Sequence, residues 1–343
     1  MPLTETVPLS KRLECFIHLG KFLRTLPYQE KAFLASQARM ENPWFTEQNV
    51  LIALQNLAIM LEEEEVVNFV LHYPWLGENR PSETIGIVSA GNIPAVGFHD
   101  LFCVLIAGHR IQLKPSKSDS VLIKFLVHKI MELEPAFAER IQLVDRLVGF
   151  DRVICTGSDN SARYFEHYFG KYPHIIRKNR TSVAVLSGQE NSSDLHSLAE
   201  DIFTYYGFGC RNVSKLFLPK GYEIARFLEA MEPFSYTIQH HKYANNYDYN
   251  KAIFIVNGQP YYDNGFLLLK ESSSLFSPLS VLYFEYYETL EEARRLLEKS
   301  QQDLQCVVSK INVIPKRIDF GTTQCPKLID YADGVDTIAF LGS

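Results

Sequence analysis

The sequence has 343 residues, of which 46% are hydrophobic and 13% aromatic, so it can bury a large core and is not that of a disordered protein. Its net charge of -6 argues against a nucleic-acid-binding protein, which needs a basic face for phosphates. The length favours two domains. The N-terminus lacks the pattern of a signal peptide, and no apolar run is long enough to span a membrane, so we expect a cytoplasmic protein.

The cysteines are scattered along the chain and form no CxxC pair, and none lies near a histidine at the spacing of metal ligands. We therefore expect no metal site. In a reducing cytoplasm we also expect these cysteines to be thiols and not disulfides. They are Cys15, Cys103, Cys155, Cys210, Cys306 and Cys325.

Periodic apolar residues predict helices over 10–26 and 46–72, the second with Thr46 as its N-cap. From Thr84 onward, short apolar strands alternate with helices. The predicted strands lie at 84–88, 109–114, 152–156 and 182–186, and the predicted helices at 95–107, 119–133 and 159–169. This alternation predicts a parallel, doubly wound α/β sheet.

From about residue 204 the alternation of strands and helices begins again, which predicts a second α/β domain. The expected strands are 214–219, 252–258, 266–272, 279–287 and 306–311, and the expected helices are 221–231 and 289–302. The second of these helices opens with a capping box of Thr289 and Glu292. The chain ends in an apolar segment, 337–341, for which we expect a strand that pairs with the first domain or with another subunit.

The chain lacks the GxGxxG dinucleotide motif, a Walker A loop and a GxSxG elbow, so its chemistry must rest on other residues. Cys210 follows two glycines in Gly207-Phe208-Gly209, a sequence that predicts a tight loop. Such a loop can expose a thiol, and a thiolate attacks thioesters and aldehydes readily. The alternative is that Cys210 is a small buried apolar residue.

Two further candidates lie directly after predicted strands. Asn92, between a strand and a helix, could donate its amide to an oxyanion, although an ordinary helix cap would look the same. Lys114 and Lys117 could hold ribose and phosphate groups, although solvated lysines are the simpler interpretation.

The order of these segments resembles the aldehyde dehydrogenase superfamily between about residues 84 and 300. The segments that carry the resemblance are GNIP at 91–94, LIAGHRIQLKPS at 105–116, CTGS at 155–158, GFGC at 207–210 and LFSPL at 275–279. The resemblance implies an aldehyde dehydrogenase-like α/β fold, with a doubly wound cofactor domain and a smaller α/β catalytic domain. It implies Cys210 and Asn92 as catalytic residues. The implied cofactor-binding residues are Lys114, Ser116, Lys117, Thr156, Gly157, Ser158 and Phe276.

The chain is more closely similar to acyl-CoA reductases of the bacterial luminescence type, the LuxC type. The segments concerned are 89–109, 179–188 and 241–254. This resemblance implies NADPH as the reductant and an acyl-CoA or acyl-protein thioester as the substrate. The product would be an aldehyde, formed through an acyl-cysteine intermediate.

Three departures from the superfamily pattern bear on function. The stretch 174–186 has no glutamate to activate water, which favours thioester reduction over oxidation to an acid. Lys117 replaces the usual acidic residue at the ribose, which favours NADPH over NADH. Ser274 stands where a ribose-binding glutamate is usual, and the chain is shorter than the superfamily norm.

We therefore expect a nucleotide-binding domain with a helical N-terminal part at 1–203, a catalytic domain at 204–312, and a C-terminal return or oligomerisation segment at 313–343. His99 is a candidate acid or base, with a structural histidine as the alternative. We expect a homo-oligomer. Three other functions stay open: a reductase of acyl phosphates, a cysteine acyltransferase or thioesterase that uses no nucleotide, and a non-catalytic partner that kept the fold.

Overall fold

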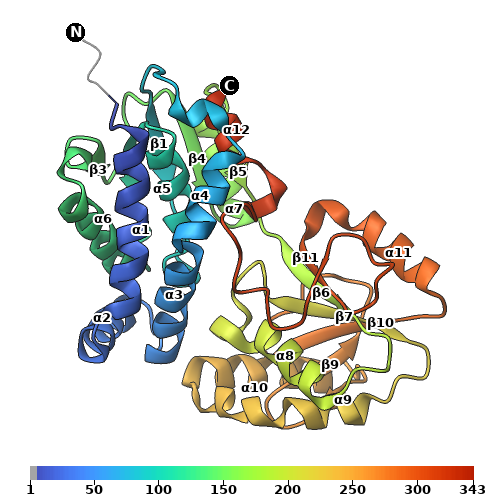
Figure 1. Ribbon diagram of the computed structural model, residues 1–343. Coiled ribbons are helices and arrows are strands. Elements are labelled where there is room, and N and C mark those ends of the chain that lie inside the picture. Colours follow the sequence, from blue (N-terminus) through green and yellow to red (C-terminus); the bar gives the residue numbers. More distant parts are fainter. Residues whose placement is uncertain (1–5) are drawn as a thin grey trace. The chain divides into compact units, whose positions relative to one another are not determined.

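The computed structural model describes residues 6–343 (Figure 1). Contacts within this part of the chain define two compact units. The first runs up to Asn179 and also includes Cys325–Ser343, and the second is Arg180–Gln324. The chain therefore returns to the first unit at its C-terminal end.

The first unit contains a parallel sheet and helices on both faces of it. Its strands are β1 (Thr84–Val88), β2 (Arg110–Lys114), β3 (Ile141–Leu143), β4 (Arg152–Thr156) and β5 (His174–Arg177). Its α-helices are α1 (Leu9–Thr25), α2 (Tyr28–Glu41), α3 (Glu47–Met60), α4 (Glu63–Leu71), α5 (Phe98–Ile106), α6 (Ser120–Leu133), α7 (Asp159–Phe169) and α12 (Thr337–Gly342). Short 3-10 helices are η1 (Pro74–Gly77), η2 (Pro135–Phe137) and η6 (Ala332–Gly334).

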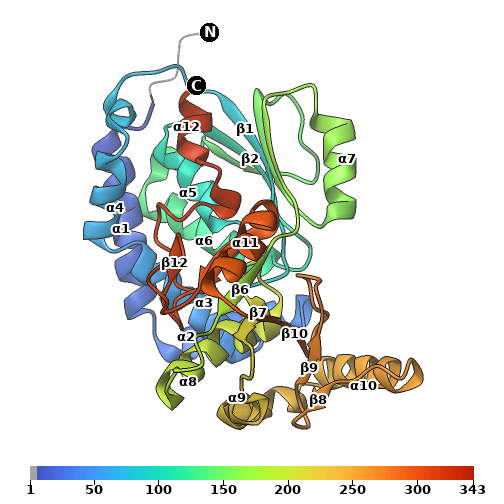
Figure 2. The same cartoon turned by 90° about the vertical axis from the view of Figure 1, so that its right-hand side faces the viewer.

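The strand order in this sheet is β3-β2-β1-β4-β5, and neighbouring strands pair in parallel. Figure 2 shows α5 and α6 on one face and α7 on the other. The residues of β1 explain why both faces are covered: Ile85 and Ile87 belong to the core shared with α1, α5 and α6, whereas Gly86 faces Leu147. The predicted doubly wound α/β fold is confirmed.

The second unit is also built on a sheet. Its strands are β6 (Thr181–Val185), β7 (Val213–Pro219), β8 (Tyr262–Asp263), β9 (Leu268–Glu271), β10 (Val281–Tyr287), β11 (Leu304–Val308) and β12 (Arg317–Ile318). Its α-helices are α8 (Ser192–Phe203), α9 (Ile224–Met231), α10 (His241–Val256) and α11 (Leu290–Lys299), and its 3-10 helices are η3 (Thr204–Gly207), η4 (Glu232–Gln239) and η5 (Gln301–Asp303).

The order of the second sheet is β12-β11-β6-β7-β10-β9-β8, in which β8 pairs antiparallel with β9 and the other neighbours pair in parallel. The strand β6, which the sequence analysis assigned to the first domain, is hydrogen-bonded to β7 and β11 in this sheet. The chain crosses from one sheet to the other between Arg177 and Thr181. The contacts accordingly divide the chain at 179/180, whereas the sequence analysis expected 203/204.

Three predicted elements differ from the structure. The helix expected over 46–72 is two helices, α3 and α4, with Leu61 and Glu62 between them. The strand expected over 252–258 is mostly part of α10, whose buried residues Tyr243, Tyr247 and Phe254 recur at helical spacing. The strand expected over 337–341 is the helix α12, which Asp336 caps.

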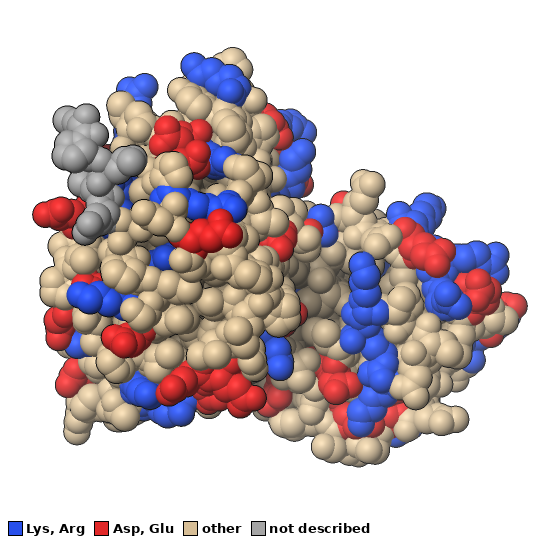
Figure 3. All heavy atoms as spheres, turned by 45° about the horizontal axis from the view of Figure 1, so that its top comes forward, with Lys and Arg blue, Asp and Glu red and all other residues tan. Residues whose placement is uncertain are grey.

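On the face that Figure 3 shows, basic and acidic side chains are interspersed among a larger area of uncharged residues. No helix among residues 6–343 combines the length and the apolar character needed to cross a membrane.

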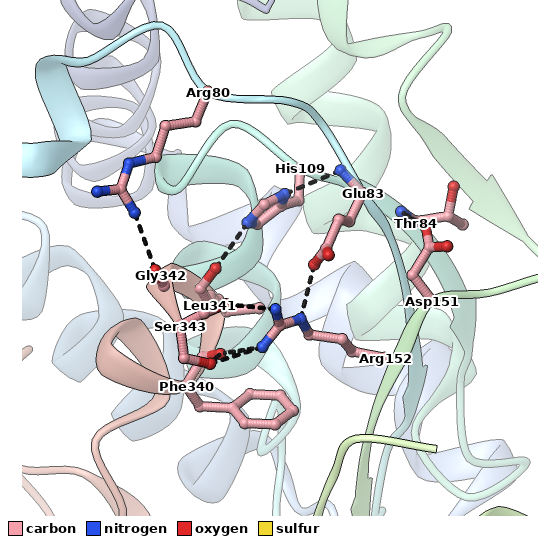
Figure 4. Close-up of polar contacts among 10 residues, drawn as sticks. All are labelled: Arg80, Glu83, Thr84, His109, Asp151, Arg152, Phe340, Leu341, Gly342 and Ser343. Carbon is pink, nitrogen blue, oxygen red and sulfur yellow. Dashed lines mark hydrogen bonds and ion pairs between the residues drawn. The ribbon is translucent and has the colours of Figure 1, made fainter. Parts of the chain in front are cut away.

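The returning C-terminal segment is anchored in the first unit by hydrogen bonds to the carbonyl groups of α12 (Figure 4). Arg152 donates to the Phe340 carbonyl at 2.7 Å, and Arg80 donates to the Gly342 carbonyl at 2.8 Å. Cationic side chains at the carboxyl end of a helix satisfy carbonyls that have no partner within the helix. The helix α12 also packs against α5.

Candidate functional site

The carboxyl ends of β1, β2 and β4 meet at one edge of the first sheet. Val88 pairs with Lys114 on one side and with Cys155 on the other. The strand order reverses between β1 and β4, because β2 and β3 lie on one side of β1 and β4 and β5 on the other. In open α/β sheets, ligands bind at such a switch point, outside the carboxyl ends of the strands. This edge brings together the loops that contain all the cofactor-binding residues predicted in the first unit.

The loop between β1 and α5 contains the exposed Asn92. A Cβ at Gly91 would collide with the Ser116 Oγ, so this loop lies directly against the loop after β2. The Asn42 side chain donates to the Gly91 carbonyl at 3.2 Å. Ala95 has a positive φ of 57°, a conformation that costs energy in a non-glycine residue. The loop is thus tightly packed against its neighbour and locally strained.

The loop after β2 contains two exposed lysines, Lys114 and Lys117. Ser116 lies between them and its Oγ accepts the backbone N–H of Ser118 at 3.2 Å. Segment 114–118 contains no acidic residue. Its exposed charges are therefore ammonium groups, which suit the phosphates of a nucleotide.

The loop after β4 consists of Thr156, Gly157 and Ser158. The Ser158 hydroxyl caps α7 by accepting the backbone N–H of Ser161 at 3.3 Å. A Cβ at Gly157 would lie 2.8 Å from the Ser161 Cβ, so the residue after Thr156 must be small for α7 to pack here. Ser158 thus has a structural role alongside any contact with a cofactor.

A buried ion pair that the sequence analysis did not find supports this loop. Arg177, at the end of β5, donates to the Asp100 carboxylate at 2.5 Å, and their side chains are 3% and 10% exposed. The same guanidinium contacts the Thr156 hydroxyl at 3.5 Å and the Thr337 hydroxyl at 2.9 Å. Arg177 therefore joins β5, α5, the Thr156 loop and α12. No sequence motif signals this pair, because its partners lie far apart in the chain.

His99 lies on α5, within the first unit. Its Nε2 is 2.8 Å from the Leu328 carbonyl, its Nδ1 is 3.8 Å from the Cys103 Sγ, and its ring packs edge-on against Tyr331. Both ring nitrogens thus face groups of the first unit, as in a structural histidine. The acid or base role of His99 stays a prediction and is not part of the mechanism proposed below.

In the second unit, Cys210 is partly exposed and lies in the short loop between η3 and β7. The loop is entered through three consecutive residues of left-handed conformation, Tyr205 (φ 54°), Tyr206 (φ 56°) and Gly207 (φ 83°). Two of these are not glycine, and such backbone strain is concentrated at functional sites. The predicted tight glycine-containing loop is therefore present in the structure.

Two buried side chains hold this loop. Asn212 accepts the backbone N–H of Gly209 at 2.8 Å and donates to the Thr204 carbonyl at 2.7 Å. Ser182, on β6, donates to the Cys210 carbonyl at 3.0 Å and accepts the backbone N–H of Cys306 at 3.1 Å. The main chain on either side of the Cys210 thiol is thus fixed.

Phe276 is 47% exposed and lies in the loop between β9 and β10. Two side chains of β7 bind this loop: Ser214 donates to the Leu275 carbonyl at 2.7 Å, and Lys215 donates to the Ser273 carbonyl at 3.0 Å. Because β7 begins three residues after Cys210, the structure brings the Cys210 loop and the Phe276 loop to the same end of β7.

A cavity of about 40 Å³ lies within the second unit. Its lining is mostly apolar and includes Tyr206 and Gly207 of the loop that leads to Cys210, with Val213, Leu279 and Val281. Among residues 6–343, no group of three His, Cys, Asp or Glu side chains is arranged to hold a metal ion.

Comparison with known proteins finds a family model that matches part of the chain. Residues 75–232 match the family described as "Acyl-CoA reductase (LuxC)". This range includes Asn92, Cys210 and the loops after β2 and β4. No curated protein matches the sequence.

Several solved structures share the fold. An NAD-dependent benzaldehyde dehydrogenase from Corynebacterium glutamicum is 11% identical, with a TM-score of 0.65 over 88% of this chain and 76% of that one. The aldehyde dehydrogenase KauB from Pseudomonas aeruginosa is 14% identical, with a TM-score of 0.62 over 88% and 72%. An indole-3-acetaldehyde dehydrogenase in complex with NAD+ is 14% identical, with a TM-score of 0.61 over 88% and 72%.

At these identities the structural matches establish the fold alone. The resemblance that the sequence analysis stated is confirmed on both counts: residues 75–232 match the LuxC acyl-CoA reductases, within a chain that has the aldehyde dehydrogenase fold.

Proposed function

We propose that this protein reduces an acyl thioester, either an acyl-CoA or an acyl-protein, to an aldehyde with NADPH through an acyl-Cys210 intermediate. The observation that carries the proposal is a partly exposed cysteine in a strained, firmly held loop within the range that matches the acyl-CoA reductases. A thiolate is a strong nucleophile toward a thioester carbonyl.

The residues of the switch-point edge fit a phosphorylated dinucleotide. Lys114 and Lys117 present ammonium groups on a segment without acidic side chains. Gly91 lets its loop lie against Ser116, and Gly157 leaves room for α7. Lys114, Ser116, Lys117 and the loop 156–158 would hold the cofactor, and Phe276 would pack near its nicotinamide ring. An ammonium group at Lys117 favours a 2′-phosphate, hence NADPH over NADH.

The proposed first half-reaction uses only residues of this chain. The Cys210 thiolate attacks the thioester carbonyl carbon and forms a new carbon–sulfur bond. The Asn92 amide and the Cys210 backbone N–H donate to the resulting oxyanion. The original carbon–sulfur bond then breaks, and the departing thiolate takes a proton from solvent, which leaves acyl-Cys210.

The second half-reaction returns the enzyme to its thiolate form. Bound NADPH would supply the hydride that reduces the acyl-cysteine carbon. Asn92 again stabilises the oxyanion, which collapses with loss of the Cys210 thiolate and release of the aldehyde. The balance is one thioester, one NADPH and one proton, giving one aldehyde, one thiol and NADP+. Water attack on acyl-Cys210 is not favoured, because the stretch 174–186 contains no glutamate that could act as the base.

The test is nicotinamide oxidation and aldehyde formation with a panel of acyl-CoAs, acyl-carrier proteins and acyl phosphates. Wild type, Cys210→Ala and Cys325→Ala are compared, because Cys325 is an exposed cysteine outside the matched range. We expect aldehyde from thioesters with wild type and Cys325→Ala, and none with Cys210→Ala.

Other outcomes point to the alternatives. Acylation of Cys210, seen by intact mass, with thiol release but no nucleotide oxidation would favour a transferase or thioesterase. Turnover of acyl phosphates alone would favour the acyl phosphate reductase. No reaction of Cys210 with any acyl donor would leave a non-catalytic partner.

A further inference from the structure

Asp119 precedes the helix α6, but its side chain makes no hydrogen bond to that helix. It occupies the N-cap position of α6, where an aspartate ordinarily accepts backbone N–H groups of the first turn, yet its side chain makes no cap hydrogen bond. Glu41, at the end of α2, takes that place: its carboxylate accepts the N–H groups of Ser120 at 2.9 Å and Val121 at 3.1 Å. The helix α6 is thus capped by Glu41 of α2, and the Asp119 side chain does not serve as its cap.

The Asp119 side chain is instead buried under the loop that contains Asn92. Asp119 is only 1% exposed, and neither of its carboxylate oxygens makes a hydrogen bond of full geometry within residues 6–343. The groups that stabilise its charged form are the backbone N–H groups of Ala95 and Val96. Its Cβ also lies 3.3 Å from the place that a Cβ of Gly91 would occupy.

The strained part of the loop is the part that Asp119 faces. Ala95 has the positive φ of 57°, and its N–H is one of the two backbone groups that lower the pKa of Asp119. Burial is the largest influence on this group and raises the pKa of Asp119, and the nearby Glu41 also raises it, whereas the two N–H groups act in the opposite direction. A buried carboxylate with incomplete hydrogen bonds is costly, so its position calls for a role beyond packing.

We propose that Asp119 is a positioning residue that holds the strained Ala95–Val96 backbone and thereby orients Asn92 toward the oxyanion. The inference rests on the proposed function, since it gives Asn92 the role stated there. Asp119 also follows Lys117 by two residues in the cofactor loop, so one side chain connects the loop that would bind nucleotide with the loop that contains Asn92.

The test compares Asp119→Asn with Glu41→Gln. The asparagine has nearly the same shape but loses the carboxylate charge and one of its two acceptor oxygens. We expect kcat for aldehyde formation to fall by about tenfold or more, because a small misplacement of Asn92 weakens its contact with the oxyanion, with little change in KM for the acyl thioester. Glu41→Gln weakens the cap of the same helix, so it should lower the unfolding temperature and leave kcat within about twofold of wild type.

A double-mutant cycle asks whether Asp119 acts through Asn92. When Asn92→Ala is already present, adding Asp119→Asn should lower kcat further by less than about twofold, because the side chain that Asp119 positions has been removed. If the two losses multiply in full, Asp119 does not act through Asn92 and the inference is overturned. A wild-type kcat in Asp119→Asn alone would overturn it equally.

Hydrogen exchange of peptides covering 89–97 separates this inference from the proposed function, because it needs no substrate. Exchange at Ala95 and Val96 should be faster in Asp119→Asn than in wild type or Glu41→Gln. If wild type shows no turnover, the proposed function fails, but hydrogen exchange still tests whether Asp119 holds the Ala95–Val96 backbone. Unchanged exchange in Asp119→Asn would refute that contact. If Asp119→Asn does not fold, Ala95→Gly/Asp119→Asn takes its place, since glycine removes the strain at Ala95.

Discussion

The side-chain oxygen of Asn212 accepts the backbone N–H of Gly209 at 2.8 Å, and so fixes the residue that precedes Cys210. Its amide nitrogen donates to the carbonyls of Asp201 at 3.1 Å and Thr204 at 2.7 Å. One buried amide thus connects the end of α8 with the cysteine loop. The strained backbone at Tyr205 and Tyr206 is held between these two attachments.

We predict that Asn212→Ala lowers the free energy of unfolding by about 1–3 kcal/mol, because it leaves the Gly209 N–H and the Thr204 carbonyl without this partner in a buried place. The rate at which iodoacetamide alkylates Cys210 should change as the loop relaxes. Denaturant unfolding and peptide mass mapping measure the two effects. The control is Asn246→Ala, which removes an amide that donates to the Lys242 carbonyl of its own helix and should cost less than about 0.5 kcal/mol. Equal losses in the two variants would contradict the role given to Asn212.

A second prediction concerns the choice of nucleotide. Lys117→Glu should lower the ratio of kcat/KM for NADPH to that for NADH by about tenfold or more, because the change removes a cation from the 2′-phosphate and adds a repulsive charge. Steady-state kinetics with both nucleotides measures the ratio. Lys124→Glu makes the same change of charge at an exposed position on α6 and should leave the ratio near that of wild type. An unchanged ratio in Lys117→Glu would show that Lys117 does not contact the 2′-phosphate.

The third prediction concerns the ion pair of Arg177 and Asp100. Arg177→Met should lower the free energy of unfolding by about 3–5 kcal/mol, since it leaves the Asp100 carboxylate buried without its cation. Arg177→Met/Asp100→Leu should lose less than the single variant, because it removes both buried charges. Thermal or denaturant unfolding of wild type, Arg177→Met, Asp100→Leu and the double variant measures this. If the double variant loses as much as the sum of the separate changes, the pair is not the source of the effect.

Strands β1 and β4 were predictable because a buried parallel strand is a short apolar run followed by a turn. Strand β2 was predictable from the alternation of apolar and polar residues in RIQLK. The rule for short apolar runs fails for 252–258 and 337–341, since such a run fits a buried helix equally well. Strands β3 and β5 were missed because they are only three and four residues long. Length and composition alone do not distinguish such segments from loops.

In the candidate site, too, residues in short motifs were predictable, whereas residues whose partners lie far away in the sequence were not. Cys210 and Asn92 were identified from short motifs, because glycines and prolines mark the loops that contain them. Asn212, Asp119 and Arg177 were missed, because their roles depend on partners that the fold brings close: a helix end, a loop backbone and a buried carboxylate.

His109 connects the start of the first sheet with α12 (Figure 4). Its Nδ1 accepts the backbone N–H of Glu83 at 3.1 Å, so this nitrogen carries no proton, and its Nε2 lies 3.2 Å from the Leu341 carbonyl, to which it donates. The ring is buried. Burial is the largest influence and lowers the pKa of His109; Arg152 and Arg12 lower it further, whereas the Leu341 carbonyl and Glu83 act in the opposite direction.

The fourth prediction follows from this lowered pKa. The unfolded chain binds a proton at His109 as the pH falls through about 6.5, whereas the folded protein resists doing so until lower pH. The contribution of His109 to stability is therefore complete above that pH and is lost on acidification toward the lower pKa of the fold. His109→Gln, which can still accept from Glu83 or donate to Leu341, has no titrating group. We expect the unfolding temperature of wild type to fall more than that of His109→Gln between about pH 7.5 and pH 5.5. Parallel pH dependences in the two proteins would show that His109 is protonated equally in the folded and unfolded states.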